Sequence, residues 1–268
     1  MRVRYVGNPE ISKIVNEYPE HQCYSLEMVY GEGMMSEGGA NAIDEMFHGI
    51  ELNNKIALDV GAGLGGVAFY LAKRYQTQVT GLEINPWLVE ESTSRTPVDL
   101  SNKVNFMLYS DSAHLNFQTN HFDIIYSKGV LVHLENKSPL FKELYRILKP
   151  GGKLIINDWL SPVQEQWNNK VKELCESEGF AFYAVSPSNY SDLLQQAGFK
   201  HIQHQDKQAV YAQYNQSIAD WLRNETNAEL FKARFGSKAW EEALWGYQLI
   251  AASMQEGELL VSLFHAQK

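Results

Sequence analysis

Residues 59–66 read DVGAGLGG and come directly after a short run of branched apolar residues. A glycine-rich turn between a strand and a helix lets backbone amides and the helix N-terminus approach a ligand closely. Gly61, Gly63 and Gly66 fit the dinucleotide pattern G-x-G-x-x-G, whereas Gly61, Gly63 and Gly65 fit a tighter G-x-G-x-G. The stretch predicts a strand–turn–helix unit that holds an adenine-containing cofactor, and it leaves the choice of cofactor open.

Around this turn, short apolar runs alternate with longer amphipathic segments from residue 55 to residue 158. Such alternation is typical of repeated strand–helix units that form a parallel sheet. We expect strands at 55–60, 78–83, 104–109, 122–127 and 153–158, and helices at 65–75, 86–96 and 139–148. Residues 149–152, KPGG, predict a stop and a turn. The predicted fold class is α/β, with a Rossmann-like doubly wound core.

The remaining segments are predicted to extend this core at both ends. Residues 1–52 form an N-terminal cap in this prediction, with a helix at 9–18 that covers the mouth of the site. Residues 53–160 are the cofactor-binding core, and residues 161–268 hold lid insertions and the rest of the sheet. There we expect a helical insertion at 161–184, a helix at 189–197 and an aromatic segment at 210–247. Two further strands are expected at 201–206 and 258–266. The whole chain, 1–268, is predicted to be one domain around a seven-stranded sheet.

Composition narrows the class of partner. The chain has 268 residues, 44% of them hydrophobic, and a formal net charge of −9 without a block of basic residues. We therefore expect no nucleic acid or membrane partner, and a small molecule instead. Cys23 and Cys175 lack metal-type spacing, and no export signal or membrane span is found, so we expect reduced thiols in a cytoplasmic protein. We expect a monomer, although the sequence does not fix the oligomeric state.

Three acidic positions distinguish the candidate cofactors. Asp59 stands two residues before Gly61, where a carboxylate repels a pyrophosphate and suits a cationic or zwitterionic ligand. Glu83 ends the second predicted strand, where an acid accepts hydrogen bonds from ribose hydroxyls. Asp111 and Ser112 follow the third predicted strand, where a carboxylate can bind the adenine amino group. Together these positions favour S-adenosyl-L-methionine, with S-adenosyl-L-homocysteine as its product, over a nicotinamide dinucleotide.

Five motifs follow one another between residues 55 and 159: DVGAGLGG, GLEI, SDSAHL, FDIIYSKGVLVHL and RILKPGGKLIINDW. Their order and spacing resemble the successive motifs of class I S-adenosylmethionine-dependent methyltransferases. The resemblance implies a transferase of this class, with Ala62, Ile84 and Ser127 beside the cofactor in addition to the glycines and acids above. A NAD-binding oxidoreductase and a fold relative that binds no cofactor are the remaining alternatives.

His133 lies just beyond the fourth predicted strand, at the carboxyl edge where doubly wound sheets bind ligands. Histidine titrates near neutral pH, which suits a general base or proton relay. A packing and hydrogen-bonding residue at a helix start is the structural alternative.

The segment NEYPEHQCYSLEMVYGEGMMSEGG, upstream of the glycine turn, is similar to the corresponding part of phosphoethanolamine N-methyltransferases. In that family a tyrosine of the N-terminal helix and a histidine form a catalytic pair over the acceptor nitrogen. The resemblance implies that Tyr18 and His133 form this pair and that Met35 and Ser36 contact cofactor and substrate. Tyr24 is close enough to take the place of Tyr18 if the alignment shifts.

Departures from that family concern the acceptor. Gly129, which we expect to contact substrate, replaces an acidic residue four positions before the histidine, and Trp159 replaces a tyrosine after the fifth strand. The positions of the phosphate contacts fall on Glu176, Phe180 and Phe182, none of which binds a phosphate dianion. Whether the acceptor carries a phosphate or a carboxylate is therefore open.

The last residues, from ALWGYQ onward, loosely resemble sarcosine and dimethylglycine N-methyltransferases. Tyr24, Trp159, Trp240, Trp245 and Tyr247 can form a face for a methylated ammonium, to which each ring contributes about 0.5–2 kcal/mol. Aromatic residues at this spacing also pack in cores. We expect substrate contacts from Tyr24, Trp159 and Tyr247.

The expected reaction is methyl transfer to the nitrogen of a small amine, either phosphoethanolamine-like or glycine- or sarcosine-like. The alternative is an O- or C-methyltransferase of a small apolar acceptor. No metal is predicted, because His201 and His204 alternate along a predicted strand and face opposite sides.

Overall fold

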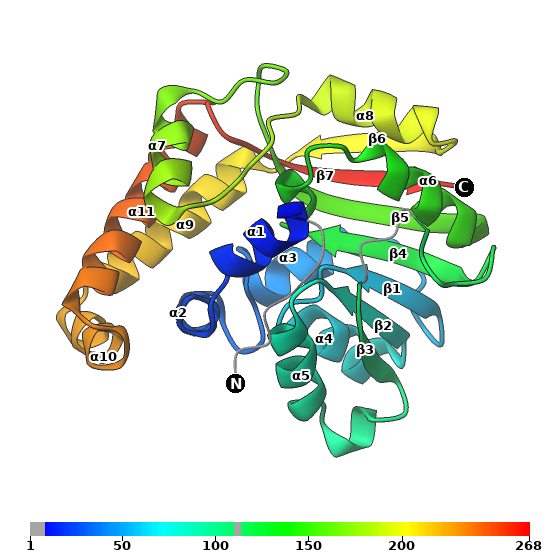
Figure 1. Ribbon diagram of the computed structural model, residues 1–268, viewed down its shortest axis with the longest axis horizontal. Coiled ribbons are helices and arrows are strands. Elements are labelled where there is room, and N and C mark those ends of the chain that lie inside the picture. Colours follow the sequence, from blue (N-terminus) through cyan, green and yellow to red (C-terminus); the bar gives the residue numbers. More distant parts are fainter. Residues whose placement is uncertain (1–8, 110–113) are drawn as a thin grey trace.

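The computed structural model describes residues 9–109 and 114–268 (Figure 1). The strands are β1 (Ile56–Val60), β2 (Gln78–Glu83), β3 (Val104–Leu108), β4 (Phe122–Lys128), β5 (Leu148–Leu160), β6 (Lys200–Asp206) and β7 (Leu260–Gln267). The helices are α1 (Pro9–Glu17), α2 (Glu20–Tyr30), α3 (Gly39–Met46), α4 (Gly66–Tyr75), α5 (Pro86–Ser94), α6 (Ser138–Ile147), α7 (Asn169–Glu178), α8 (Pro187–Gln196), α9 (Gln208–Arg223), α10 (Glu225–Phe235) and α11 (Ser237–Gln255). Two short 3₁₀ turns, η1 (Val98–Leu100) and η2 (Leu131–His133), follow α5 and β4.

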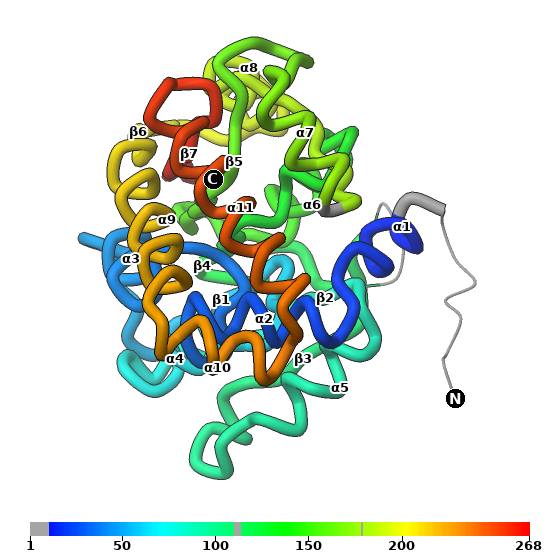
Figure 2. The backbone as a smooth tube through the Cα atoms, turned by 90° about the vertical axis from the view of Figure 1, so that its left-hand side faces the viewer, coloured from blue at the N-terminus to red at the C-terminus, as the bar shows by residue number. Residues whose placement is uncertain are grey.

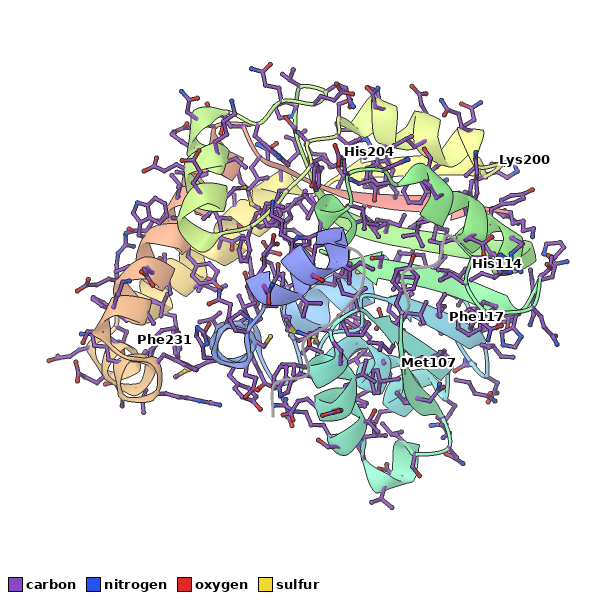
Figure 3. All side chains as sticks on the ribbon, viewed as in Figure 1. Met107, His114, Phe117, Lys200, His204 and Phe231 are labelled. Atoms are coloured by element: carbon purple, nitrogen blue, oxygen red, sulfur yellow. The ribbon has the colours of Figure 1, made fainter. Side chains whose placement is uncertain are left out.

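The strands form one sheet in the order β3-β2-β1-β4-β5-β7-β6. The strands from β3 to β5 pair in parallel, and β7 lies antiparallel between β5 and β6. Met107 on β3 and Lys200 on β6 mark the two edges (Figure 3). The strand order reverses between β1 and β4, which is where doubly wound sheets bind ligands. The predicted Rossmann-like, seven-stranded α/β fold is confirmed.

Both faces of the sheet are covered because its central strands are apolar on both sides. On one face, Phe141 of α6 and Tyr190 of α8 pack with Ile125 and Ile156. On the other face, residues of α3 and α4 pack with Ala57, Ile124 and Ile155, and these helix residues are Ile43, Met46, Ala68 and Leu71. Burying each such aliphatic or aromatic side chain contributes about 1.5–3 kcal/mol.

A separate group of helices forms a lobe beside the carboxyl ends of the strands. The helices α9 and α11 pack against each other, α7 contacts α11, and α10 contacts α2 (Figures 1 and 2). Their shared core includes Tyr30, Leu174, Phe231 and Tyr247. The predicted aromatic segment 210–247 is therefore helical and largely packed on itself, with α1 and α2 lying between this lobe and the sheet.

Three segments differ from the sequence-based prediction. The first is α1, which ends at Glu17 instead of residue 18, because the residue before a proline is disfavoured in helical conformation and Pro19 follows. The turn predicted at 149–152 lies inside β5 as a bulge, since Leu148 already pairs with Phe122. In the insertion 161–184, only the segment of α7 is helical.

Candidate active site

The glycine turn after β1 takes up the geometry of the tighter pattern. Gly61, Gly63 and Gly65 have φ angles of 82°, 53° and 88°, which side chains rarely adopt. Gly66 does not have a positive φ, but a Cβ there would lie 2.6 Å from the carbonyl oxygen of Gly33. A side chain would therefore be unfavourable at each of the four glycines. At Gly61, Gly63 and Gly65 the reason is the positive φ, and at Gly66 it is the contact with Gly33.

A cavity opens at this turn, at the carboxyl ends of β1, β2 and β4. It brings together most of the residues predicted to hold the cofactor: Met35, Ser36, Asp59, Gly61, Ala62, Gly63, Glu83 and Ile84. Ser127 is not among its lining residues, because the Ser127 hydroxyl donates a hydrogen bond to the carbonyl of Val60 inside the sheet. Asp111 and Ser112 lie outside the described residues.

Glu83 is buried at the end of β2 and is already extensively hydrogen-bonded. Its Oε1 accepts the backbone N–H groups of Ile84 and Asn85, and its Oε2 accepts that of Gly63 at 2.9 Å. Burial raises the pKa of this carboxyl, and these three hydrogen bonds oppose the increase. A carboxylate has about four acceptor positions, so one is left for a ligand hydroxyl.

Asp59 is 3% exposed and lies beside the turn. Burial raises its pKa to about 7, with a further increase from Glu83, whereas the nearby Tyr126 hydroxyl and the charge of Lys128 lower it. Within the described chain, its Oδ2 has no hydrogen-bond partner. An unpaired buried carboxylate suits a cationic ligand group, and a glycine turn without Cβ atoms suits close approach of the ligand. These residues fit S-adenosylmethionine, which is both cationic and zwitterionic.

The predicted pair lies at one side of this cavity. The hydroxyl of Tyr18 and Nε2 of His133 are 2.9 Å apart, and the two rings meet edge to face. On the other side of the imidazole, Nδ1 lies 3.3 Å from Oε2 of Glu17, close enough for an ion pair but without the alignment of a hydrogen bond. Glu17 is itself held by the N–H of Ala181, which donates to Oε1. The sequence alone did not reveal Glu17, although it directly precedes Tyr18.

A second cavity adjoins the first. Tyr18, Met35, Ser36, Gly129 and His133 line both cavities and thus form the boundary between them. The predicted substrate residues Gly129, Trp159 and Tyr247 line the second one. A pair placed between a cofactor cavity and an acceptor cavity is positioned to handle a proton of the acceptor.

Tyr24 is not brought to either cavity. Its hydroxyl donates to Oε1 of Glu91, and the guanidinium groups of Arg95 and Arg234 lie over its ring. Trp240 also packs in the helical lobe, where its indole N–H donates to the carbonyl of Leu222. Tyr24 is therefore dropped from the proposed substrate contacts.

Lys128 is a second charged residue near the boundary, besides Glu17, that sequence reasoning missed. Lys128 is 7% exposed, and its ammonium donates to Ser36 Oγ and to the backbone carbonyl of Glu37. Burial lowers the pKa of Lys128 to about 8, while Glu37 and Asp59 raise it. The lysine tethers the segment that carries Ser36 to β4. It directly precedes Gly129, and that was the only signal available.

Residues 9–109 and 114–268 hold neither a metal-type cluster nor a membrane-spanning helix. No group of three histidine, cysteine or acidic side chains within 9–109 and 114–268 is placed to hold a metal ion. Across the same ranges, no helix is long and apolar enough to cross a membrane.

Comparison with known proteins adds to this geometry. A family model described as a methyltransferase domain matches residues 58–156. The chain is 32% identical over 226 residues to phosphoethanolamine N-methyltransferase of Plasmodium falciparum, which covers 83% of this chain and 82% of that protein. It is 29% identical to phosphoethanolamine N-methyltransferase 1 of Zea mays over 94% of this chain but 49% of that protein. The chain thus spans about half the length of the maize relative.

The fold also matches a solved structure, that of phosphoethanolamine N-methyltransferase 2 of Haemonchus contortus in complex with phosphomonomethylethanolamine and S-adenosylhomocysteine. The TM-score is 0.87 at 22% identity, over 97% of this chain and 60% of that one. At this identity the likeness shows the fold, which together with the glycine turn defines a class I methyltransferase. Because the chain is 32% identical to the Plasmodium relative over most of both chains, it belongs to the phosphoethanolamine N-methyltransferase family and is an S-adenosylmethionine-dependent enzyme.

Proposed function

We propose that this enzyme transfers a methyl group from S-adenosylmethionine to the nitrogen of a small amine. The observation that carries the proposal is the pair of Tyr18 and His133, 2.9 Å apart at the boundary between the two cavities. A protonated amine must lose a proton before its lone pair can attack the methyl carbon, and a tyrosine–histidine pair can accept that proton. The names of the relatives, which are N-methyltransferases of phosphoethanolamine, support nitrogen as the acceptor atom.

In the proposed cofactor site, Asp59 faces the positively charged part of S-adenosylmethionine, and the free acceptor position of Glu83 takes a ribose hydroxyl. Met35 and Ser36 close the site on the side of the acceptor. Asp111, Ser112 and the other predicted contacts to adenine belong to the same proposal. S-adenosylmethionine, when bound, supplies an electrophilic methyl carbon on a sulfonium.

The proposed reaction needs little from the protein beyond position and one proton transfer. The acceptor nitrogen forms its bond to the methyl carbon while the carbon–sulfur bond breaks, and that electron pair stays on sulfur. Before this bond forms, one proton leaves the acceptor ammonium for the Tyr18 hydroxyl as His133 Nε2 takes the phenolic proton, which frees the lone pair of the nitrogen. Glu17, 3.3 Å from Nδ1, then stabilises the protonated imidazole.

Binding is the first experiment. S-adenosylhomocysteine at a hundred times its dissociation constant should stabilise the protein by about 2.7 kcal/mol in thermal denaturation. NAD at the same concentration is the matched control and should give no shift. Stabilisation by NAD alone would contradict the proposed cofactor.

Methyl transfer is the second experiment. We expect labelled methyl from S-adenosylmethionine to appear on nitrogen when amines are offered, with mass spectrometry of the product locating the label. Phenols of similar size are the control. Label found with phenols and never with amines would reject N-methylation while leaving the cofactor assignment intact.

We propose a cytoplasmic location for the same protein. Cys23 and Cys175 are both free thiols, which supports a reducing compartment. Fractionation of cells that produce the protein is the direct test, and recovery with exported proteins would contradict the proposal.

A further inference from the structure

The acceptor cavity, the second of the two cavities above, has an unusual distribution of charge. Within residues 9–109 and 114–268, its lining contains two glutamates, Glu37 and Glu242, but no lysine or arginine. Proteins bind phosphate and carboxylate groups mainly through arginine, lysine, protonated histidine or free backbone N–H groups. An anionic substituent on the acceptor would therefore find no lysine or arginine in this lining, and of its two histidines, His21 and His133, the second is already hydrogen-bonded to Tyr18.

Two other sources of positive potential lie beside the cavity. The ammonium of Lys128 lines the cofactor cavity and donates to Ser36 and to the backbone of Glu37. The first turn of α2 adjoins the acceptor cavity through His21 and Gln22. This turn carries the acidic Glu20, and the backbone N–H of Gln22 donates to the carbonyl of Pro19. The lysine is thus already hydrogen-bonded, and the carboxylate of Glu20 disfavours an anion at the start of α2.

Glu37 gives the cavity a buried negative group. The residue is 4% exposed, and its Oε1 has no hydrogen-bond partner within the described chain. Burial raises its pKa, while the charge of Lys128 and the nearby polar side chains of Trp159 and Asn215 oppose the increase. A buried carboxylate oxygen without a partner is costly unless a ligand supplies a donor or a positive charge. Glu242, by contrast, lies at the rim, is 58% exposed and pairs with Lys238, so it contributes less.

Aromatic rings form the rest of the wall. Phe180 stacks on Tyr18 and on Phe182, and Phe182 meets both Trp159 and His133 edge to face, with ring centroids 4.9–5.5 Å apart. Phe231 closes the far side from α10 in the helical lobe (Figure 3). Such rings attract cations through their faces and bury apolar groups. The cavity volume is about 170 Å³, and an engineered apolar cavity of about 150 Å³ holds benzene.

We infer that the acceptor is a primary or secondary amine on an uncharged body about the size of one aromatic ring, without phosphate or carboxylate. The inference rests on the proposed N-methyl transfer and names its substrate class. The ammonium approaches Glu37 and the aromatic wall, and the apolar body fills the space between Phe182 and Phe231. This class differs from phosphoethanolamine, whose methylation gives the family its name.

The experiment compares four probes with the intact enzyme and S-adenosylmethionine: 2-phenylethylamine, phosphoethanolamine, sarcosine and phenol. We expect N-methylation of 2-phenylethylamine with a kcat/KM at least tenfold above that of the two anionic amines. A preference for phosphoethanolamine or sarcosine would overturn the inferred substrate class and leave N-methyl transfer standing. Transfer to phenol and to none of the amines would instead overturn the proposed function itself.

A variant tests the role of the buried carboxylate. Glu37→Gln keeps the size of the side chain and removes its charge, so 2-phenylethylamine should bind roughly 10- to 100-fold more weakly in calorimetry with S-adenosylhomocysteine present. The uncharged analogue 2-phenylethanol should lose less than threefold. Glu241→Gln, the same change at an exposed position outside the cavity lining, is the control for unchanged affinity. Equal affinity of Glu37→Gln and the wild type for the amine would contradict the inference. If Glu37→Gln does not fold, the four-probe comparison still decides it.

Discussion

The hydroxyl of Tyr18 lies 2.9 Å from Nε2 of His133, although 115 residues separate the two in the chain. Tyr18 is brought there because Pro19 ends α1 at Glu17, and His133 because η2 follows β4 at the carboxyl edge of the sheet. Two independent elements therefore converge on one hydrogen bond. That convergence is the basis of the first two predictions.

His133→Ala should lower turnover by roughly two to four orders of magnitude, the range for a positioned proton-transfer group. Affinity for S-adenosylhomocysteine should change less than threefold, because the proposed role of the imidazole is to take a proton from the acceptor and not to bind the cofactor. Initial rates and calorimetry measure the two quantities. Full turnover of His133→Ala from pH 6 to pH 9 would make the histidine a structural residue.

Glu17→Gln should lower turnover by roughly tenfold to a hundredfold, because it removes the charge beside Nδ1 of His133 while keeping an oxygen for the N–H of Ala181. KM for the acceptor should stay within about threefold, since Glu17 lines neither cavity. Steady-state kinetics separates the two parameters. Glu20→Gln, an exposed acid on the next helix, is the matched control. An increase in KM with unchanged kcat would show that Glu17 binds the acceptor instead.

Cofactor affinity should depend on pH through Asp59, whose pKa burial raises to about 7. Burial favours the neutral acid in the free protein, whereas the cationic ammonium of S-adenosylhomocysteine favours the carboxylate, so binding releases a proton. Affinity should therefore rise with pH below about 7, by up to tenfold per pH unit, and become level above it. Calorimetry between pH 5.5 and pH 8 measures this dependence.

Asp59→Asn is the control for that dependence. The amide cannot ionise, so the variant should bind S-adenosylhomocysteine more weakly and with a flat pH profile. Affinity of the wild type that falls as pH rises would contradict the assigned role of Asp59.

Gly61→Ala should damage both stability and cofactor binding. The φ of Gly61 is 82°, and an added Cβ would lie 2.4 Å from the side chain of Val130. Gly49→Ala is the matched control, since its φ of 74° imposes a similar backbone cost but nothing lies within 4 Å. We expect losses of about 1–2 kcal/mol for the control and about 2–5 kcal/mol for Gly61→Ala in chemical denaturation. Equal losses would show that the contact with Val130 relaxes freely.

The core of the fold could be predicted because its signals are local. Each strand from β1 to β5 contains a short apolar run, and the spacing of the glycines predicts the positive φ angles of the turn. The positions of Asp59 and Glu83 follow from these signals, since both end parallel strands at the same edge. The pairing of Tyr18 with His133 came from a family resemblance, because no local pattern links two positions so far apart.

The acceptor cavity could not be predicted in the same way. Phe231 and Tyr247 reach it through the packing of α10 and α11, which helical periodicity does not specify. Tyr24 illustrates the opposite case: its position in the sequence suggested the site, but Glu91 and Arg95 hold its side chain elsewhere. Glu37 carried no signal at all beyond an acid in a polar segment, since only folding buries it.

A double-mutant cycle on Tyr18 and His133 tests the central claim most directly, namely that the two residues work as one proton relay. Turnover of Tyr18→Phe, His133→Ala and the double variant would be measured with the amine that gives the highest kcat/KM for the wild type. Residues that act as a unit have strongly non-additive effects. The double variant should therefore turn over within about threefold of the slower single variant. If instead the two losses multiply, the 2.9 Å contact does not couple the residues in catalysis, and the relay is contradicted.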